Sequence, residues 1–397
     1  MYACSTLQEI SHVSNVEKIK QLERELATEG IDTLLILSRE DSDKVLPLLL
    51  PVHVVAQTAF FFNRNGRHIV LTGSTDANMY KPFGLFEIIE VVEDFETDFL
   101  ATFNRINPRS VALNISETDY LADGLTLGQY RLLESIIGGE RLAALEKSSE
   151  PIVRTLRAIK SEQELTCIRH AVDVTCTIYE EIAPNIRIGM SETDIGALFV
   201  EGMKRHNVIN AFAEPYSYPL VCINRCGLAH RQPSSRNILM EGDILICDFS
   251  VSHQGYCSDI ARSFYALGKG ESQAPQPILR AFQTTVNAVS AVIEGLKPGL
   301  MGYEADLLGR SLIEQAGYPT IRHSVGHQVG MRVHDGGTSL SPSSNPNSHY
   351  AIQKGEVYAI EPTVIQDDGK PSFIVEEDVL ITDDGVQILS KRQMDLW

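Results

Sequence analysis

Four carboxylates in the C-terminal part of the chain have the spacing of two strand pairs that share a site. Asp248 ends an apolar run and Asp259 follows eleven residues later, whereas Glu361 ends a second apolar run and Glu376 follows fifteen residues later. These separations suit adjacent strands of a hairpin. Carboxylates that lie close together in an apolar setting raise one another's pKa unless cations neutralise them. Two divalent ions would cancel the four charges, so the pattern predicts a two-metal centre.

The imidazole of such a centre is best supplied by His327. It lies between Gly326 and Gly330, and flanking glycines permit close approach of the backbone. Oxygen-rich sites with one imidazole favour manganese, cobalt, iron or zinc over metals bound by thiolates, with the two ions roughly 3.5–4 Å apart. We expect two divalent ions per subunit, manganese first, with cobalt or zinc as alternatives.

An internal repeat supplies the elements that must position these residues. The segments that begin at Ala171 and Ala281 both reach a glycine after 18 residues. Each copy is followed by a strand-like run that starts at a glycine and ends six residues later in an acid, at 242–248 and 355–361. Two similar halves, each with a helix pair and a strand that bears a carboxylate, imply pseudo-twofold packing. That packing would bring the carboxylates face to face.

The first part of the chain has the pattern of a small α/β domain. A helix is predicted over 16–29, and strands are predicted at 33–37, 59–62, 68–72 and 110–114, with a hairpin at 63–66. The pattern changes at 148–151, where we place the domain boundary. A long helix is predicted from about 155 to 183, and it includes the capping-box sequence at 161–164.

The composition is that of an ordinary globular protein. The 397 residues are 43% hydrophobic and 22% charged, and this length exceeds what one core usually supports, so we expect two domains. The formal charge of −18 argues against a nucleic-acid partner, because backbone binding needs a basic surface. The seven cysteines show no repeated spacing, which indicates reduced thiols. No signal-peptide pattern and no apolar window of ~18 residues is present, so we expect a cytoplasmic protein with no membrane partner.

Four stretches of the chain resemble the motifs of a known family. They are EGDILICDFSVSHQGYCSDIARSFY at 241–265, HSVGHQVGMRVHDGG at 323–337, GEVYAIEP at 355–362 and VEEDVLIT at 375–382. They resemble the M24 metallopeptidases, the pita-bread family that includes Xaa-Pro dipeptidase (prolidase), aminopeptidase P and methionine aminopeptidase. The resemblance extends from about residue 155 to the end of the chain.

The resemblance implies an α/β protein of two parts. A small N-terminal creatinase-type domain over 1–150, found in prolidases and absent from methionine aminopeptidases, would precede a pita-bread catalytic metallopeptidase domain over 155–397 that contains the pseudo-twofold repeat. The family commonly dimerises, so a homodimer is expected.

The resemblance also implies a role for each site residue. The metal ligands would be Asp248 for one ion, Asp259 and Glu376 for both, and His327 and Glu361 for the second. Glu361 would also shuttle a proton to the leaving nitrogen. Alignment of 379–382 with the closing strand of the family selects Glu376, and its neighbour Glu377 is the alternative.

Three more histidines, His230, His323 and His334, align with positions of the family that face the substrate. They would line the cleft, where an imidazole can donate to the substrate carbonyl, hold a terminal carboxylate or relay a proton.

The implied activity is hydrolysis of Xaa-Pro bonds in small peptides, in the first place dipeptides as in prolidase, by a hydroxide that two metals activate. The alternatives are aminopeptidase P action on longer Xaa-Pro peptides, or a non-peptidase pita-bread hydrolase or binding protein. Many relatives have a tyrosine and an arginine where this chain has Ile365 and Ile374. That difference leaves an altered substrate preference or a weak activity open.

Overall fold

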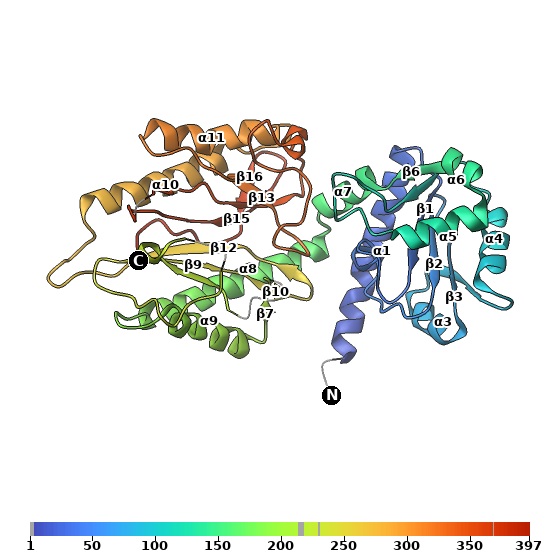
Figure 1. Ribbon diagram of the computed structural model, residues 1–397, viewed down its shortest axis with the longest axis horizontal. Helices are drawn as coiled ribbons and strands as arrows, with labels where there is room; N and C mark the ends of the chain where they lie inside the picture. The colour runs from blue at the N-terminus through green and yellow to red at the C-terminus, as the bar shows by residue number, and fades with distance from the viewer. Residues whose placement is uncertain (1–3, 213–217, 229–230, 368) are drawn as a thin grey trace. The chain divides into compact units, whose positions relative to one another are not determined.

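The computed structural model describes residues 4–212, 218–228, 231–367 and 369–397, with side chains from residue 16 onward. The chain forms two units, Met1–Arg157 and Ala158–Trp397 (Figure 1). Among the described residues, no helix has the length and apolar character needed to cross a membrane.

A six-stranded sheet in the order β4-β3-β2-β1-β5-β6 forms the centre of the N-terminal unit. The strands are β1 (Thr33–Ser38), β2 (Thr58–Asn63), β3 (His68–Thr72), β4 (Phe86–Glu90), β5 (Val111–Leu113) and β6 (Glu146–Ser148). The helices are α1 (Cys4–Thr28), α2 (Leu46–Leu49), α3 (Ser74–Tyr80), α4 (Phe95–Ile106), α5 (Leu127–Ile137), α6 (Gly139–Leu145) and α7 (Glu150–Ala158), with the 3₁₀ turn η1 (Lys81–Phe83). The predicted hairpin at 63–66 is confirmed, because β2 and β3 pair antiparallel with Ala59 opposite Leu71.

The C-terminal unit contains two similar halves. The first half holds α8 (Glu162–Ile182), η2 (Ala183–Asn185), α9 (Glu192–His206), β7 (Ile209–Asn210), β8 (Leu220–Ile223), η3 (Asn224–Cys226), β9 (Ile244–Phe249), β10 (Val251–His253), β11 (Tyr256–Cys257) and β12 (Ile260–Tyr265). The second half holds α10 (Gln276–Gly295), α11 (Gly302–Gln315), β13 (Gly326–Gln328), η4 (Pro346–His349), β14 (Val357–Ile360), β15 (Glu377–Ile381) and β16 (Val386–Ile388). Figure 1 shows the strands between the green helix pair α8 and α9 and the orange pair α10 and α11.

The backbone of the two halves repeats in detail, as the sequence predicts. Gly189 and Gly299 follow the first helix of each pair, and both adopt left-handed φ angles of +94° and +89°, which an L side chain rarely adopts. Each glycine donates its N–H to a carbonyl 2.9 Å away, that of Leu239 in the first half and that of Ile352 in the second. Each helix pair packs in its own hydrophobic cluster, and both clusters contain strand residues of both halves, such as Ala359 in the first and Ile246 in the second.

The predicted helix over 155–183 is wrong as a single element. Helix α7 ends at Ala158, and α8 begins at Glu162 with Ser161 as its N-cap. The Ser161 hydroxyl accepts from the Glu164 N–H at 3.3 Å, and the Glu164 carboxylate accepts from the Ser161 N–H at 2.6 Å. A capping box satisfies the free N–H groups of a helix start, so it belongs at the beginning of α8 and separates it from α7.

Gly302→Ala should destabilise the protein by about 1–3 kcal/mol, because a methyl group there has no room. Gly302 begins α11, and a Cβ atom would lie 3.0 Å from the carbonyl oxygen of Ser348 and closer still to that of Ser339. Gly128→Ala in α5 is the matched control, since a Cβ there would meet nothing within 4 Å. It should be neutral or stabilise by up to about 1 kcal/mol. Urea unfolding measures both, and equal effects would contradict the packing described.

Candidate metal centre and cavity

The first carboxylate pair lies on two antiparallel strands of the first half. Asp248 is on β9 opposite Ala261 of β12, and Asp259 directly precedes β12. The Ser250 hydroxyl, which follows β9, donates to Oδ1 of Asp259 at 2.7 Å. The strand pairing expected from the spacing is therefore present, and it leaves Asp259 almost fully buried.

The second carboxylate pair occupies the matching place in the second half. Glu361 directly follows β14 and Glu376 directly precedes β15. Because Ile360 pairs with Glu377 in the antiparallel ladder, Glu361 and Glu376 form the next opposing pair. The same register continues to the bridge between Val364 and Phe373.

Two hydrogen bonds join the halves at the carboxylates themselves. The Glu376 N–H donates to the carbonyl of Ala261 at 3.2 Å, and the Asp259 N–H donates to Oδ2 of Asp378 at 2.9 Å. The ends of β12 and β15 are thereby held side by side, which brings the carboxylates of the two halves to one place.

His327 comes from β13, opposite Ala359 of β14. Its Nε2 lies 3.4 Å from Oδ2 of Asp259 and 3.6 Å from Oε1 of Glu361. Ligand atoms of Asp259, His327 and Glu376 all lie within 4.8 Å of one another. Burial lowers the pKa of His327 to about 4, so the imidazole is neutral at pH 7, as a metal ligand must be.

The carboxylates of this arrangement are buried and repel one another. Burial raises the pKa of Asp248, Glu361 and Glu376 well above the ordinary carboxylate range, and repulsion from Asp259 raises each of them further. Oδ1 of Asp248 is buried and has no hydrogen-bond partner among the described residues. A buried carboxylate oxygen without a partner, beside three other acids and a neutral imidazole, fits a set of donors for divalent cations.

The five residues open onto a cavity of about 390 Å³. Its other polar lining residues are Ser324, His323, His334 and Cys222. The apolar lining consists of Phe212, Leu220, Leu228, Ile246, Val333, Ile365 and Ile374. A small concave space with an apolar wall and a few convergent polar groups is the usual form of a site for a small ligand.

The three accessory histidines differ in their surroundings. His230 lies outside the described residues. His323 and His334 both line the cavity, and the ring of His334 lies edge-on to that of His327 with the centroids 4.3 Å apart. Both ring nitrogens of His323 have protein partners, because Nδ1 lies 2.6 Å from the carbonyl of Ser324 and Nε2 lies 2.8 Å from the hydroxyl of Thr363.

Arg262 is a residue behind the site whose position the sequence does not reveal. Its side chain is 1% exposed. Its guanidinium donates to the carbonyl of Glu376 at 2.7 Å and to the carboxylate of Glu377 at 3.0 Å. Side chains alternate along a strand, so Glu377 points to Arg262 while Glu376 lines the cavity. The only hint in the sequence is an arginine within a strand-like run, which requires a partner if buried.

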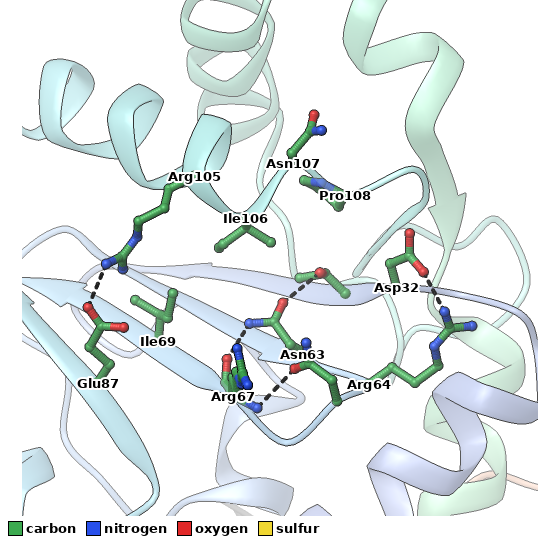
Figure 2. A pocket seen from close by; sticks show the side chains of 12 residues that line it. Asp32, Asn63, Arg64, Arg67, Ile69, Glu87, Arg105, Ile106, Asn107 and Pro108 are labelled. Atoms are coloured by element: carbon green, nitrogen blue, oxygen red, sulfur yellow. Dashed lines mark hydrogen bonds and ion pairs between the residues drawn. The ribbon is translucent and has the colours of Figure 1, made fainter.

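A second hollow of about 440 Å³ lies in the N-terminal unit, and none of the predicted site residues lines it. Figure 2 shows two of its arginines paired with acids: Arg64 pairs with Asp32 at 2.8 Å, and Arg105 pairs with Glu87 at 2.7 Å. The clustered acids and imidazoles of the C-terminal cavity have no counterpart among the residues that line this hollow.

Known proteins share both the sequence pattern and the fold. The pattern described as Metallopeptidase family M24 matches residues 166–383. A Xaa-Pro dipeptidase of Pyrococcus horikoshii is 27% identical over 253 residues, which are 63% of this chain and 67% of that protein. An X-Pro aminopeptidase of Thermotoga maritima has a similar structure, with a TM-score of 0.73, 24% identity and coverage of 96% of this chain and 99% of the other.

A Xaa-Pro dipeptidase of Bacillus anthracis likewise superposes with a TM-score of 0.75, at 21% identity, over 96% of this chain and 99% of its own. At identities of 24% and 21%, the two solved structures show the fold alone. They confirm the predicted α/β class over nearly the whole chain. The family pattern covers more than half of the chain, including all four carboxylates and the histidine between them. The chain therefore belongs to metallopeptidase family M24.

Proposed function

We propose that this protein hydrolyses Xaa-Pro peptide bonds at the cavity of the C-terminal unit, with two divalent cations bound there. The observation that carries the proposal is the convergence of four carboxylates and one neutral imidazole on one cavity that also has an apolar wall. Membership of family M24 and the similarity to a protein named Xaa-Pro dipeptidase support it. A noncatalytic binding protein with this fold would have no need to retain all five residues.

The residues proposed to hold the cations are Asp248 for one ion, Asp259 and Glu376 for both, and His327 and Glu361 for the second. The ions would lower the pKa of a bound water toward neutrality and polarise the scissile carbonyl. Manganese is the proposed metal, since oxygen-rich donor sets suit it, with cobalt and zinc as alternatives. The homodimer remains a prediction.

The proton balance of the reaction points to Glu361. An Xaa-Pro bond has no amide hydrogen, so the leaving proline nitrogen must gain a proton. Glu361 lies at the cavity wall, and its Oε1 lies 3.6 Å from Nε2 of His327, beside the place where the attacking water would be held. A carboxylate at that place can accept a proton from the attacking water and pass it to the leaving nitrogen. The apolar walls of the cavity limit the access of bulk water to this transfer.

Metal removal should destabilise the protein, and Asp248→Asn should relieve part of that loss. Burial raises the pKa of Asp248 in the folded state, so the stability gained by keeping this group neutral is present at low pH and lost as the pH rises. At pH 7.5 with a chelator, the variant should melt about 2–4 °C above the wild type, the shift that 1 kcal/mol produces in a domain of this size. Added manganese should raise the melting temperature of the wild type more than that of the variant.

Asp173→Asn on the exposed side of α8 is the control for this removal of one charge. It should respond to chelator and manganese as the wild type does. A wild-type melting temperature that none of manganese, cobalt and zinc changes would contradict the metal centre.

Metal-stripped protein resupplied with manganese, cobalt or zinc should release alanine from Ala-Pro, Ala-Pro-Ala or both. Asp259→Asn should lower kcat by more than the roughly 10–100-fold that loss of an outer-shell partner causes, because it removes a proposed bridging ligand. Chromatographic detection of alanine measures both, and Asp173→Asn should match the wild type. If neither peptide is cleaved with any of the three metals, the proposed function is wrong.

A further inference from the structure

The residues 389–397, which we call the C-terminal segment, bury polar side chains and expose apolar ones. Ser390 is 7% exposed and Gln393 is 1% exposed, whereas Met394 and Trp397 are 47% and 39% exposed. This is the reverse of the usual distribution, in which apolar side chains are buried and polar ones face water. A buried polar group needs hydrogen-bond partners, so the partners of Ser390 and Gln393 indicate what the segment does.

Gln393 covers part of the free edge of β12. This strand lies at the edge of the sheet β12-β9-β8, so every second residue turns its backbone groups away from β9. At Ser263, Oε1 of Gln393 accepts from the N–H at 3.0 Å, and Nε2 of Gln393 donates to the carbonyl at 2.7 Å. The side-chain amide thus takes the place that the peptide group of a neighbouring strand would occupy.

The edge positions on either side of Ser263 are also occupied. The carbonyl of Ala261 accepts from the Glu376 N–H at 3.2 Å, and the N–H of Tyr265 donates to the carbonyl of Trp397 at 2.8 Å. Glu376 belongs to the second half, and the other partners along this edge belong to the C-terminal segment. The segment therefore extends the junction between the halves that begins at Glu376.

The same segment holds the residue that follows Glu376. The Glu377 carboxylate accepts from the Ser390 hydroxyl at 2.5 Å and from the Gln393 N–H at 2.9 Å. Its third donor is the guanidinium of Arg262 at 3.0 Å. Glu377 is 0% exposed, and a buried carboxylate is tolerated where such donors replace water.

Gln393 is thus bonded to both strands that carry the proposed bridging ligands. Asp259 directly precedes β12, and Glu376 directly precedes β15, whose first residue is Glu377. Because the distance between consecutive Cα atoms is fixed, a shift of β12 at Ser263 or of β15 at Glu377 displaces the ligand at the start of that strand. Metal ligands must be held within about 0.5 Å of their productive positions.

We propose that Gln393 is a positioning residue for the metal centre, because it fixes the separation of Asp259 and Glu376. Its side-chain amide holds β12, its N–H holds Glu377 on β15, and Ser390 supports the same carboxylate. It acts through the two strands and not on the substrate. This inference rests on the proposed function, to which the metal centre belongs.

Gln393→Met tests the inference, because methionine has a similar length but cannot form the two side-chain hydrogen bonds to Ser263. Calorimetric titration of the metal-stripped variant should give a manganese affinity about tenfold below that of the wild type, the lower end of the effect of losing an outer-shell partner. Gln387→Met, at an exposed position of β16, is the matched control. It should bind manganese as tightly as the wild type.

Ser390→Ala provides a second measurement if Gln393→Met does not fold. It should weaken manganese binding by about threefold, less than Gln393→Met, since Glu377 keeps its bonds to Arg262 and to the Gln393 N–H. Circular dichroism at the temperature of the titration identifies the variants that are folded. A purely structural role would lower the free energy of unfolding and leave the manganese affinity of the folded protein unchanged.

The titrations separate failure of the inference from failure of the proposed function. Wild-type affinity in folded Gln393→Met, or in Ser390→Ala if the first variant is unfolded, would overturn the positioning role and leave the proposed function intact. A wild type that binds none of manganese, cobalt and zinc would remove the metal centre, and the inference with it.

Discussion

Mutual repulsion among buried carboxylates is the constraint on which the C-terminal unit depends. Asp248, Asp259, Glu361 and Glu376 come from two half-repeats, and burial raises the pKa of three of them well above the ordinary range. A chain that needed only stability would not place four acids in one apolar pocket, because each loses hydration and repels the others. The rest of the unit is the framework that holds these groups together, and the proposed cations would balance their charge.

The framework that positions the acids is built on two hydrophobic clusters. The helix pairs α8–α9 and α10–α11 pack in separate hydrophobic clusters, and the strands that end in acids are anchored in those clusters. The halves then meet through hydrogen bonds at the acids themselves, from the Glu376 N–H to the Ala261 carbonyl and from the Asp259 N–H to the Asp378 carboxylate. Arg262, fully buried, fixes the strand of Glu376 from behind without its charge reaching the cavity. The charge of Arg262 thus supports the geometry of the strand but does not neutralise the acids that line the cavity. The proposed cations would do so.

The low polarity of the cavity walls has two chemical consequences. Apolar walls strengthen every electrostatic interaction near the proposed metal centre. They also disfavour any buried substrate group that brings an unbalanced charge. Ile365 and Ile374 stand where many relatives have a tyrosine and an arginine. Their side chains make the space beside Glu361 and Glu376 apolar.

Much of this protein could be predicted from the sequence, because local patterns and repeats encode it directly. The spacing of the acids, the repeat from Ala171 and Ala281, and the hairpin at 63–66 depend on strand alternation and turn residues that neighbours in the chain determine. The capping box at Ser161 marks the start of α8, whereas the predicted helix over 155–183 extends across it.

Tertiary structure decided what depends on partners distant in the chain. The strand register turns Glu377 toward Arg262 and Glu376 toward the cavity, a choice that two adjacent glutamates cannot disclose by themselves. Likewise, only the fold reveals that Thr363 engages His323 and that no lysine or arginine among the described residues reaches the cavity wall. The sequence determined which chemical groups are present and at what intervals. Their charge environment could arise only when segments more than a hundred residues apart were packed together, because burial and Coulomb interactions act through space.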